Sequence, residues 1–280
     1  MVTVNDVSFR YGKKPLLFHD LSMELSTNSI YGLLGRNGAG KTSLLKLLAG
    51  MRYRDSGRIS VDGFDPADRD PGFLEDLFFI GEEFASPPVS VKMYEELYGP
   101  LYPRFSATDY SNYVEEFQLD PTQKLSEMSY GQKKKVLLAF GLASNTALFL
   151  LDEPTNGLDI PSKTQFRRLL AGAASENRVI VISTHQVRDM ENLIDPIVIL
   201  DNGVVIFSEE MDSVTTRLRM QTGPQAPEDS LYSERAMGGV ASIVRNDGGQ
   251  DSNIDLELLF NAVTNNPEQF ASIFAREVAV

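Results

Sequence analysis

The sequence predicts an α/β protein with a mostly parallel central sheet, and three stretches carry this prediction. Residues 147–151 and 179–183 are short, almost wholly apolar runs, as expected of strands that are buried on both faces of a parallel sheet. A third apolar run, residues 30–34, leads into a glycine-rich turn that is followed by an apolar-periodic segment, residues 43–49. This order of strand, turn and helix suits a ligand site at the edge of the sheet.

The glycine-rich turn at residues 35–42 fits the phosphate-loop pattern G-x-x-x-x-G-K-[ST]. Glycines let successive N–H groups point at phosphate oxygens, and the helix that starts near Lys41 adds its N-terminal N–H groups. Lys41 would place a cation near the β- and γ-phosphates, and the Thr42 hydroxyl would be a Mg²⁺ ligand. The turn therefore predicts a P-loop NTPase fold, with nucleotide contacts from Gly35, Arg36, Asn37, Gly38, Ala39, Gly40, Lys41, Thr42 and Ser43.

Composition narrows the class of protein. A net charge of −13 over 280 residues argues against a nucleic-acid binder, and we interpret two basic groups, Arg52, Arg54 and Arg58 and residues 133–135, as solvated surface. With no cysteine and two histidines, the chain has neither a thiolate metal site nor a histidine-rich centre. We find no export signal and no apolar run near the roughly 18–20 residues of a membrane helix, so another chain would have to cross a membrane.

Two further segments surround the predicted sheet. The β-rich stretches Val2–Phe9 and 21–25 predict an antiparallel β subdomain, and Tyr11 lies in a turn where its ring could stack on a nucleotide base. Prolines then separate helix-like pieces such as Val91–Tyr98 and 108–117. We expect a helical insertion at about residues 86–145, whose many aromatic side chains form a small core.

Three more candidate sites lie near the end of the insertion or after it. Asp152 and Glu153 end an apolar strand, where the first acid would hold Mg²⁺ and the second could accept a proton from the attacking water. His185 ends the next strand and could bond the γ-phosphate. The polar turn Ser129-Tyr130-Gly131-Gln132 opens a helix at residues 133–143 and could be a second phosphate reader.

The C-terminal part gives weaker signals. Residues 197–200 and 204–207, joined by Asp201-Asn202-Gly203, predict a hairpin. Beyond it we expect a linker at 223–228, a strand at 238–245, a polar loop at 247–252 and a helix at 254–263. The predicted organisation is a nucleotide-binding domain over residues 1–210 and a small extension over 211–280.

In order and spacing, these motifs resemble those of the ATP-binding-cassette (ABC) ATPases, over about residues 2 to 210. The resemblance makes Tyr11 the adenine-stacking aromatic, residues 35–42 the Walker A loop, and Ser129, Gly131 and Gln132 parts of the family signature. It makes residues 148–153 the Walker B strand with the catalytic Glu153, residues 156–159 the D-loop and His185 the switch histidine.

The resemblance also implies a mechanism. Two such domains would dimerise head to tail, as a homodimer or with a related subunit, so that each ATP lies between one Walker A loop and the other signature turn. Closure would be passed through the helical insertion to transmembrane permease subunits on separate chains, with this chain at the cytoplasmic face of the membrane. The segment 86–113 resembles exporter-associated ATPases of the ABC-2 type. Alternatives are a soluble non-transport ABC ATPase and a regulator that dimerises on ATP with little hydrolysis.

This sequence departs from the family pattern at three places. Tyr130 stands where glycine is usual in the signature, and Met128 stands where leucine is usual. Glu82 takes the place of the Q-loop glutamine, where it would still reach the metal or the water but adds a charge. Because Lys41, Asp152, Glu153 and His185 remain, hydrolysis is the prediction.

Overall fold

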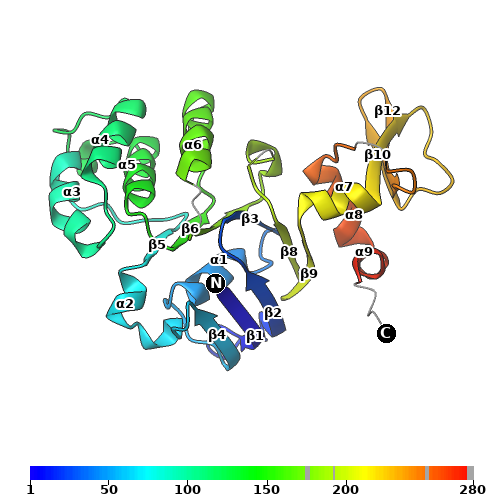
Figure 1. Cartoon of the computed structure of the whole chain (residues 1–280), viewed down its shortest axis with the longest axis horizontal. Coiled ribbons are helices and arrows are strands. Elements are labelled where there is room, and N and C mark those ends of the chain that lie inside the picture. Colours follow the sequence, from blue (N-terminus) through cyan, green and yellow to red (C-terminus); the bar gives the residue numbers. More distant parts are fainter. Residues whose placement is uncertain (174–176, 192, 250–251, 276–280) are drawn as a thin grey trace.

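A six-stranded sheet forms the centre of the protein, as described by a computed structural model over residues 1–173, 177–191, 193–249 and 252–275 (Figure 1). Its strand order is β5-β6-β7-β3-β8-β9, with only β9 antiparallel to its neighbour. The prediction of an α/β fold with a mostly parallel sheet is confirmed. The strands are β3 (Ser29–Leu34), β5 (Leu77–Ile80), β6 (Leu148–Asp152), β7 (Val179–Thr184), β8 (Ile197–Asp201) and β9 (Val204–Glu209).

The two faces of this sheet contribute to two separate apolar clusters. Along β6, Leu148 and Leu150 join the cluster that contains helix α1 (Lys41–Leu48), whereas Phe149 and Leu151 join the cluster on the opposite face. Side chains alternate between faces along a strand, so a run without polar residues is what a doubly covered strand needs. On the α1 side lies the predicted antiparallel sheet, β2-β1-β4, made of β1 (Val2–Phe9), β2 (Phe18–Leu25) and β4 (Ser56–Val61).

Helices cover the opposite face and form the insertion predicted from the proline pattern (Figure 1). Its core is aromatic: the Phe140 ring has Tyr94 and Tyr110 at centroid distances of 5.0 and 5.8 Å. The helices of the insertion are α3 (Val91–Tyr98), η2 (Gly99–Leu101), α4 (Ala107–Glu116), η3 (Leu125–Glu127) and α5 (Tyr130–Ala143). Helix α6 (Ile160–Ala173) follows the insertion and packs on the same face. The short helices η1 (Pro66–Asp68) and α2 (Pro71–Leu74) precede the insertion, and Phe73 of α2 joins the apolar cluster on the α1 side.

Helix α5 begins earlier than the sequence indicated. We expected it from residue 133, but it starts at Tyr130, directly after the N-cap residue Ser129. The Ser129 hydroxyl accepts from the Gln132 N–H at 3.3 Å, and the Gln132 side chain accepts from the Ser129 N–H at 2.9 Å. This reciprocal pair is a capping box, so Tyr130, Gly131 and Gln132 form the first turn of the helix.

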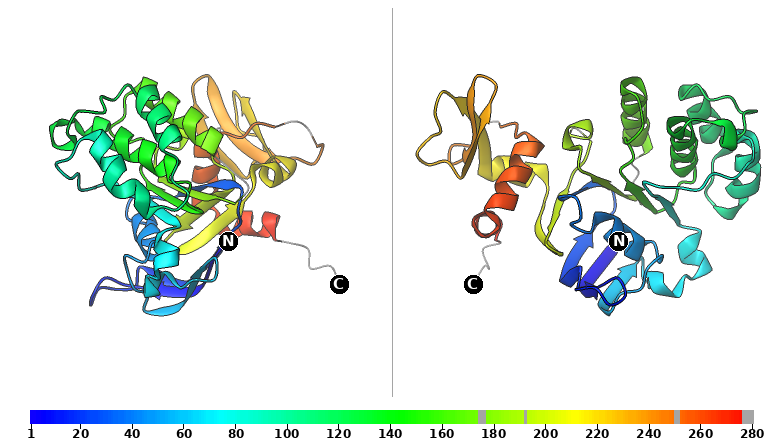
Figure 2. Two further views of the ribbon diagram at one scale, coloured as in Figure 1. Left: turned by 60° about the vertical axis from the view of Figure 1, so that its left-hand side comes forward. Right: turned by 180° about the vertical axis from the view of Figure 1, so that it is seen from behind.

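The C-terminal extension stands beside β8 and β9 (Figure 2). It has an antiparallel sheet of order β10-β12-β11 and joins the helix-side apolar cluster, with the Phe274 ring 5.2 Å from Phe207 of β9. The expected linker at 223–228 is wrong, because it connects β10 to β11 within this sheet, and part of the expected loop at 247–252 lies outside the described residues. The elements are η4 (Val187–Asp189), α7 (Met211–Arg217), β10 (Leu218–Gly223), β11 (Tyr232–Ala236), β12 (Gly239–Arg245), α8 (Leu256–Asn265) and α9 (Pro267–Phe274).

Across the part of the chain that the structure describes, each helix is too short or too polar to pass through a bilayer.

A buried arginine holds the end of α5 against the sheet. Arg178 donates to the carbonyl oxygens of Gly141 and Leu142, at 2.8 and 3.4 Å, and its guanidinium lies 4.9 Å from the Phe149 ring centroid. Burial lowers the pKa of Arg178 to about 10. The guanidinium adds charged donors to two carbonyls at the end of α5, which also accept hydrogen bonds from Ser144 and Asn145.

We predict that Arg178→Met lowers the free energy of unfolding by about 1–3 kcal/mol, because two carbonyls lose their hydrogen bonds to the buried guanidinium. Denaturant titration of the whole chain measures this change. The control is Arg168→Met, since Arg168 is 67% exposed and pairs with Glu116 at the surface. We expect the control to change stability by less than about 1 kcal/mol, and equal effects in the two variants would contradict the role given to Arg178.

Candidate nucleotide site

The phosphate loop lies between β3 and α1 and depends on its glycines. Gly38 and Gly40 have φ angles of 85° and 108°, in the region that favours glycine, and a Cβ on Gly40 would come within 2.5 Å of the Phe18 ring. Lys41 Nζ donates to the carbonyl oxygens of Gly35 and Arg36 at 2.6 and 3.4 Å. The ammonium is therefore held inside the curve of the loop, where a phosphate oxygen could replace a carbonyl partner.

Burial affects the charge of Lys41. The side chain is 7% exposed, and this desolvation lowers its pKa. The carboxylates of Glu153, Asp152 and Glu82 act in the opposite direction and favour the charged ammonium. An anion brought to the loop would add to this support for the cation.

Asp152 joins the loop to two strands. Its Oδ2 accepts a hydrogen bond from Thr42 Oγ1 at 2.7 Å, and its Oδ1 accepts one from Ser183 Oγ of β7. Because β7 lies between β6 and β3, the two bonds connect the carboxyl ends of β6 and β7 to the start of α1, which follows β3. Sequence reasoning missed Ser183, although its position as the one polar residue in an apolar run could have indicated it.

Thr42 and Asp152 offer hard oxygen donors close together, as Mg²⁺ requires. Within the described residues no group of three or more His, Asp or Glu side chains could hold a metal ion by itself. A site with one hydroxyl and one carboxylate fits the usual protein contribution to Mg²⁺, in which nucleotide phosphates and water complete the shell. Glu82, the third metal ligand expected from the sequence, lines the same cavity, and its Oε1 accepts from Asn156 Nδ2 at 3.4 Å.

Glu153 takes a sharp turn at the end of β6. Its φ of 48° lies in the left-handed region, which is uncommon for a residue with a side chain. Glu153 Oε1 lies 2.6 Å from His185 Nδ1 and accepts the His185 backbone N–H at 3.1 Å, and Oε2 accepts from Thr184 at 3.3 Å. The carboxylate predicted to be catalytic is thus oriented by the segment that carries the predicted switch histidine.

These groups surround one cavity of about 380 Å³. Tyr11 lies at its rim, where its hydroxyl is 2.9 Å from Ser43 Oγ and its ring meets Phe9 edge to face. An exposed ring in this position could stack on a base. The cavity is lined by Tyr11, Leu17, Arg36, Asn37, Gly38, Gly40, Lys41, Thr42, Ser43, Glu82, Asp152 and Glu153.

Six of the predicted site residues do not line this cavity. Gly35 and Ala39 belong to the phosphate loop, and His185 reaches the site through its contact with Glu153. Ser129, Gly131 and Gln132 form the N-cap and first turn of α5. That helix end carries N–H groups suited to an anion. However, none of its residues is among those that line the cavity. The lining of this cavity therefore lacks the signature residues that the resemblance assigns to the nucleotide site.

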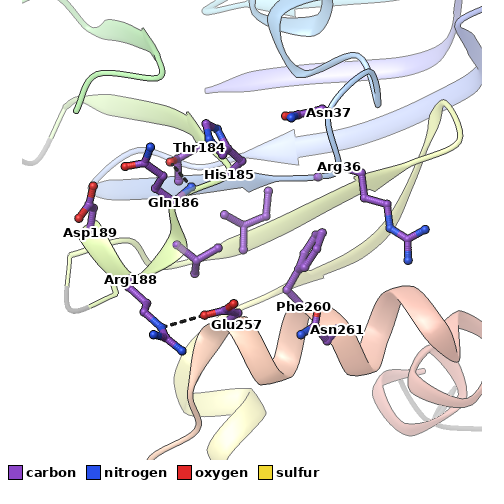
Figure 3. Close-up of a pocket in the computed structure, with 13 residues that line it drawn as sticks. Arg36, Asn37, Thr184, His185, Gln186, Arg188, Asp189, Glu257, Phe260 and Asn261 are labelled. Atoms are coloured by element: carbon purple, nitrogen blue, oxygen red, sulfur yellow. Dashed lines mark hydrogen bonds and ion pairs between the residues drawn. The ribbon is translucent and has the colours of Figure 1, made fainter. Parts of the chain in front are cut away.

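A second cavity of about 480 Å³ adjoins the first and shares Arg36 and Asn37 with it (Figure 3). On its other side lie the segment after His185 and helix α8 of the C-terminal extension. Arg188 pairs with Glu257 at 2.8 Å, and the Leu256 N–H donates to Glu191 at 3.3 Å. The extension therefore contacts the segment that directly follows the predicted switch histidine.

Lys134 was also missed. We interpreted residues 133–135 as solvated surface, which is wrong for Lys134: its side chain is completely buried, and its Nζ donates to the Glu153 carbonyl oxygen at 2.5 Å. Only its place on the inner face of α5, one turn before the apolar residues of that helix, could have indicated burial.

Comparisons with known proteins agree with this geometry. Residues 18–156 match the family model described as ABC transporter. The chain is 30% identical to the ABC transporter ATP-binding protein YtrB of Bacillus subtilis over 199 residues, which cover 70% of this chain and 67% of that protein. It is 28% identical to NatA, an ABC transporter ATP-binding protein of the same organism, over 76% of this chain and 91% of NatA.

Solved structures show the same fold. The ATP-binding subunit of an ABC transporter superposes with a TM-score of 0.70 at 24% identity, over 76% of this chain and 91% of that one. A dimeric ATP-binding cassette in a post-hydrolysis state with ADP and Pi gives a TM-score of 0.66 at 21% identity, over 75% and 99%. From the family model, the relatives and the cavity, we conclude that this chain belongs to the ABC transporter family, among its ATP-binding proteins.

Proposed function

We propose that this protein is the ATP-binding and ATP-hydrolysing subunit of an ABC transporter. It dimerises around two ATP molecules, as a homodimer or with a related subunit, and drives conformational change in separate transmembrane subunits. The main support is the meeting of Lys41, Thr42, Asp152 and Glu153 around one cavity, with His185 bonded to Glu153. In this proposal the chain binds at the cytoplasmic face of the membrane through its partner subunits.

Each side chain has a distinct task in the proposed reaction. Lys41 neutralises charge on the β- and γ-phosphates, and Tyr11 packs against the base. Thr42 and Asp152 would hold Mg²⁺, which would neutralise phosphate charge when bound. Glu153 orients the attacking water and takes its proton, and His185 holds the Glu153 carboxylate toward the γ-phosphate.

The incomplete site supports dimerisation. In the proposed dimer, the N-terminal turn of α5, with Ser129, Gly131 and Gln132, meets the triphosphate bound to a second subunit. We propose that residues 1–210 form the cassette, which contains all of these residues, and that residues 211–280 form the extension.

An exporter of the ABC-2 type is the subgroup we propose. Among the relatives are a Nod factor export ATP-binding protein of Burkholderia orbicola and a lantibiotic transport ATP-binding protein of Streptococcus pyogenes, each 29% identical to this chain. Co-purification with a membrane-spanning partner would separate a transporter subunit from a soluble non-transport ATPase.

We predict that Glu153→Gln lowers ATP turnover by about 100-fold or more while ATP binding is retained, because an amide cannot accept the proton from water. The variant is expected to accumulate as an ATP-bound dimer in size-exclusion chromatography with light scattering. Glu96→Gln is the matched control, since Glu96 is 59% exposed on α3 and lies outside the cavity. Turnover equal to that of the unaltered protein would remove Glu153 from the catalytic role.

We also predict that Asp152→Asn lowers the ratio of ATP affinity with Mg²⁺ to ATP affinity without it by about 10- to 100-fold, because the metal loses its carboxylate ligand. The measurement is ATP affinity with Mg²⁺ and with a chelator, taken on the Glu153→Gln background so that hydrolysis does not interfere. Asp68→Asn, at an exposed position on η1, should leave the ratio of the two affinities unchanged. An unchanged ratio in Asp152→Asn would place the metal elsewhere.

A further inference from the structure

Tyr130, where the family resemblance expects glycine, contacts two loops of its own subunit. Its ring stacks on Phe84 with a centroid distance of 5.2 Å and an interplanar angle of 27°, and its hydroxyl donates to the Glu82 carbonyl oxygen at 2.5 Å. The ring also lies directly on Gly157, where an added Cβ would come within 2.6 Å of it. One side chain thus connects the first turn of α5 to the segment after β5 and to the turn after β6.

Lys134 lies one helical turn further along and faces the same way, because residues four apart share a helix face. Its Nζ is 5.6 Å from the Tyr130 ring centroid and donates to the Glu153 carbonyl oxygen. Burial lowers the pKa of Lys134 to about 8, whereas the carboxylates of Glu82, Glu153 and Asp152 favour its charged form. The ammonium is thus held between the aromatic ring and the backbone of the predicted catalytic residue.

The contact between α5 and the turn after β6 leaves little room for independent movement. A Cβ on Gly131 would lie 2.6 Å from the Gly157 carbonyl oxygen, so the two backbones touch. Glu82 and Glu153 both line the nucleotide cavity. A displacement of the α5 N-terminus must therefore move the backbone of these two acids or break the contacts of Tyr130 and Lys134.

We propose that Tyr130 and Lys134 are positioning residues that transmit the position of the α5 N-terminus to Glu82 and Glu153 in the same subunit. This proposal rests on the proposed function, in which residues 129–132 bind the triphosphate of the partner subunit. The Tyr130–Lys134 pair then links the two nucleotide sites of a dimer. In such a dimer, ATP bound against the signature turn of one subunit fixes the position of that subunit's Glu153 carboxylate. This carboxylate acts on the other ATP, which lies in the subunit's own phosphate loop.

The test measures the coupling between the sites in the full chain. Tyr130→Phe removes the hydroxyl, Tyr130→Gly removes the ring, and Lys134→Met removes the ammonium at similar length. We expect the last two to lower kcat by about 5-fold or more and to bring the Hill coefficient of ATP hydrolysis toward 1, with an intermediate effect for Tyr130→Phe. ATP affinity of the dilute monomer should stay within about twofold, because neither residue lies in the cavity.

The matched control is Lys135→Met, which removes a charge from the same helix without touching Tyr130 or Glu153 and should keep the Hill coefficient of the unaltered protein. Tyr130 is 44% exposed, so its variants test the proposal even where Lys134→Met fails to fold. Equal Hill coefficients in the unaltered protein and Tyr130→Gly would overturn the proposal. Glu153→Gln assayed beside them separates the two conclusions, since loss of turnover there supports the proposed function whatever Tyr130→Gly does.

Discussion

The hydrogen bonds of Asp152 are the interaction on which the site depends. One carboxylate connects Thr42, at the start of α1, with Ser183 of β7, and it can do so because the strand order places β7 between β6 and β3. Parallel strands bring their carboxyl ends to one edge, so residues about 30 and 110 positions apart in sequence become neighbours there. The phosphate loop and the acids are thus positioned by the sheet, and the loop alone would not fix their distance.

Much of the sheet and of this edge could be predicted from sequence because both follow from local patterns. An uninterrupted apolar run specifies a strand covered on both faces, and Asp152 and Glu153 stand directly after one. Lys134 and Ser183 could not be assigned in the same way, because their contacts depend on tertiary packing. The strand β10 was hidden for a related reason: its polar, half-exposed pattern lacks the apolar run that identified β6.

Departures from the family pattern become understandable through packing. A tyrosine in place of the signature glycine looks disruptive in sequence, yet its ring has room between Phe84 and Gly157. Glu82, in place of the Q-loop glutamine, accepts a hydrogen bond from the Tyr130 hydroxyl through its backbone carbonyl, which any residue would provide. Position 130 therefore differs from the family without disturbing the groups around Lys41 and Asp152.

The contact between Phe207 and Phe274 has a consequence for the modularity of this chain. Phe207 belongs to β9 of the central sheet, and Phe274 ends the last helix of the extension, so the apolar surface on that edge is closed by residues far beyond the cassette. A chain cut after residue 210 would leave this surface open to water, together with the neighbours of Val214 and Leu218. The extension therefore covers an apolar edge of the cassette. Exchanging it between relatives would require exchanging the residues of β9 that pack against it as well.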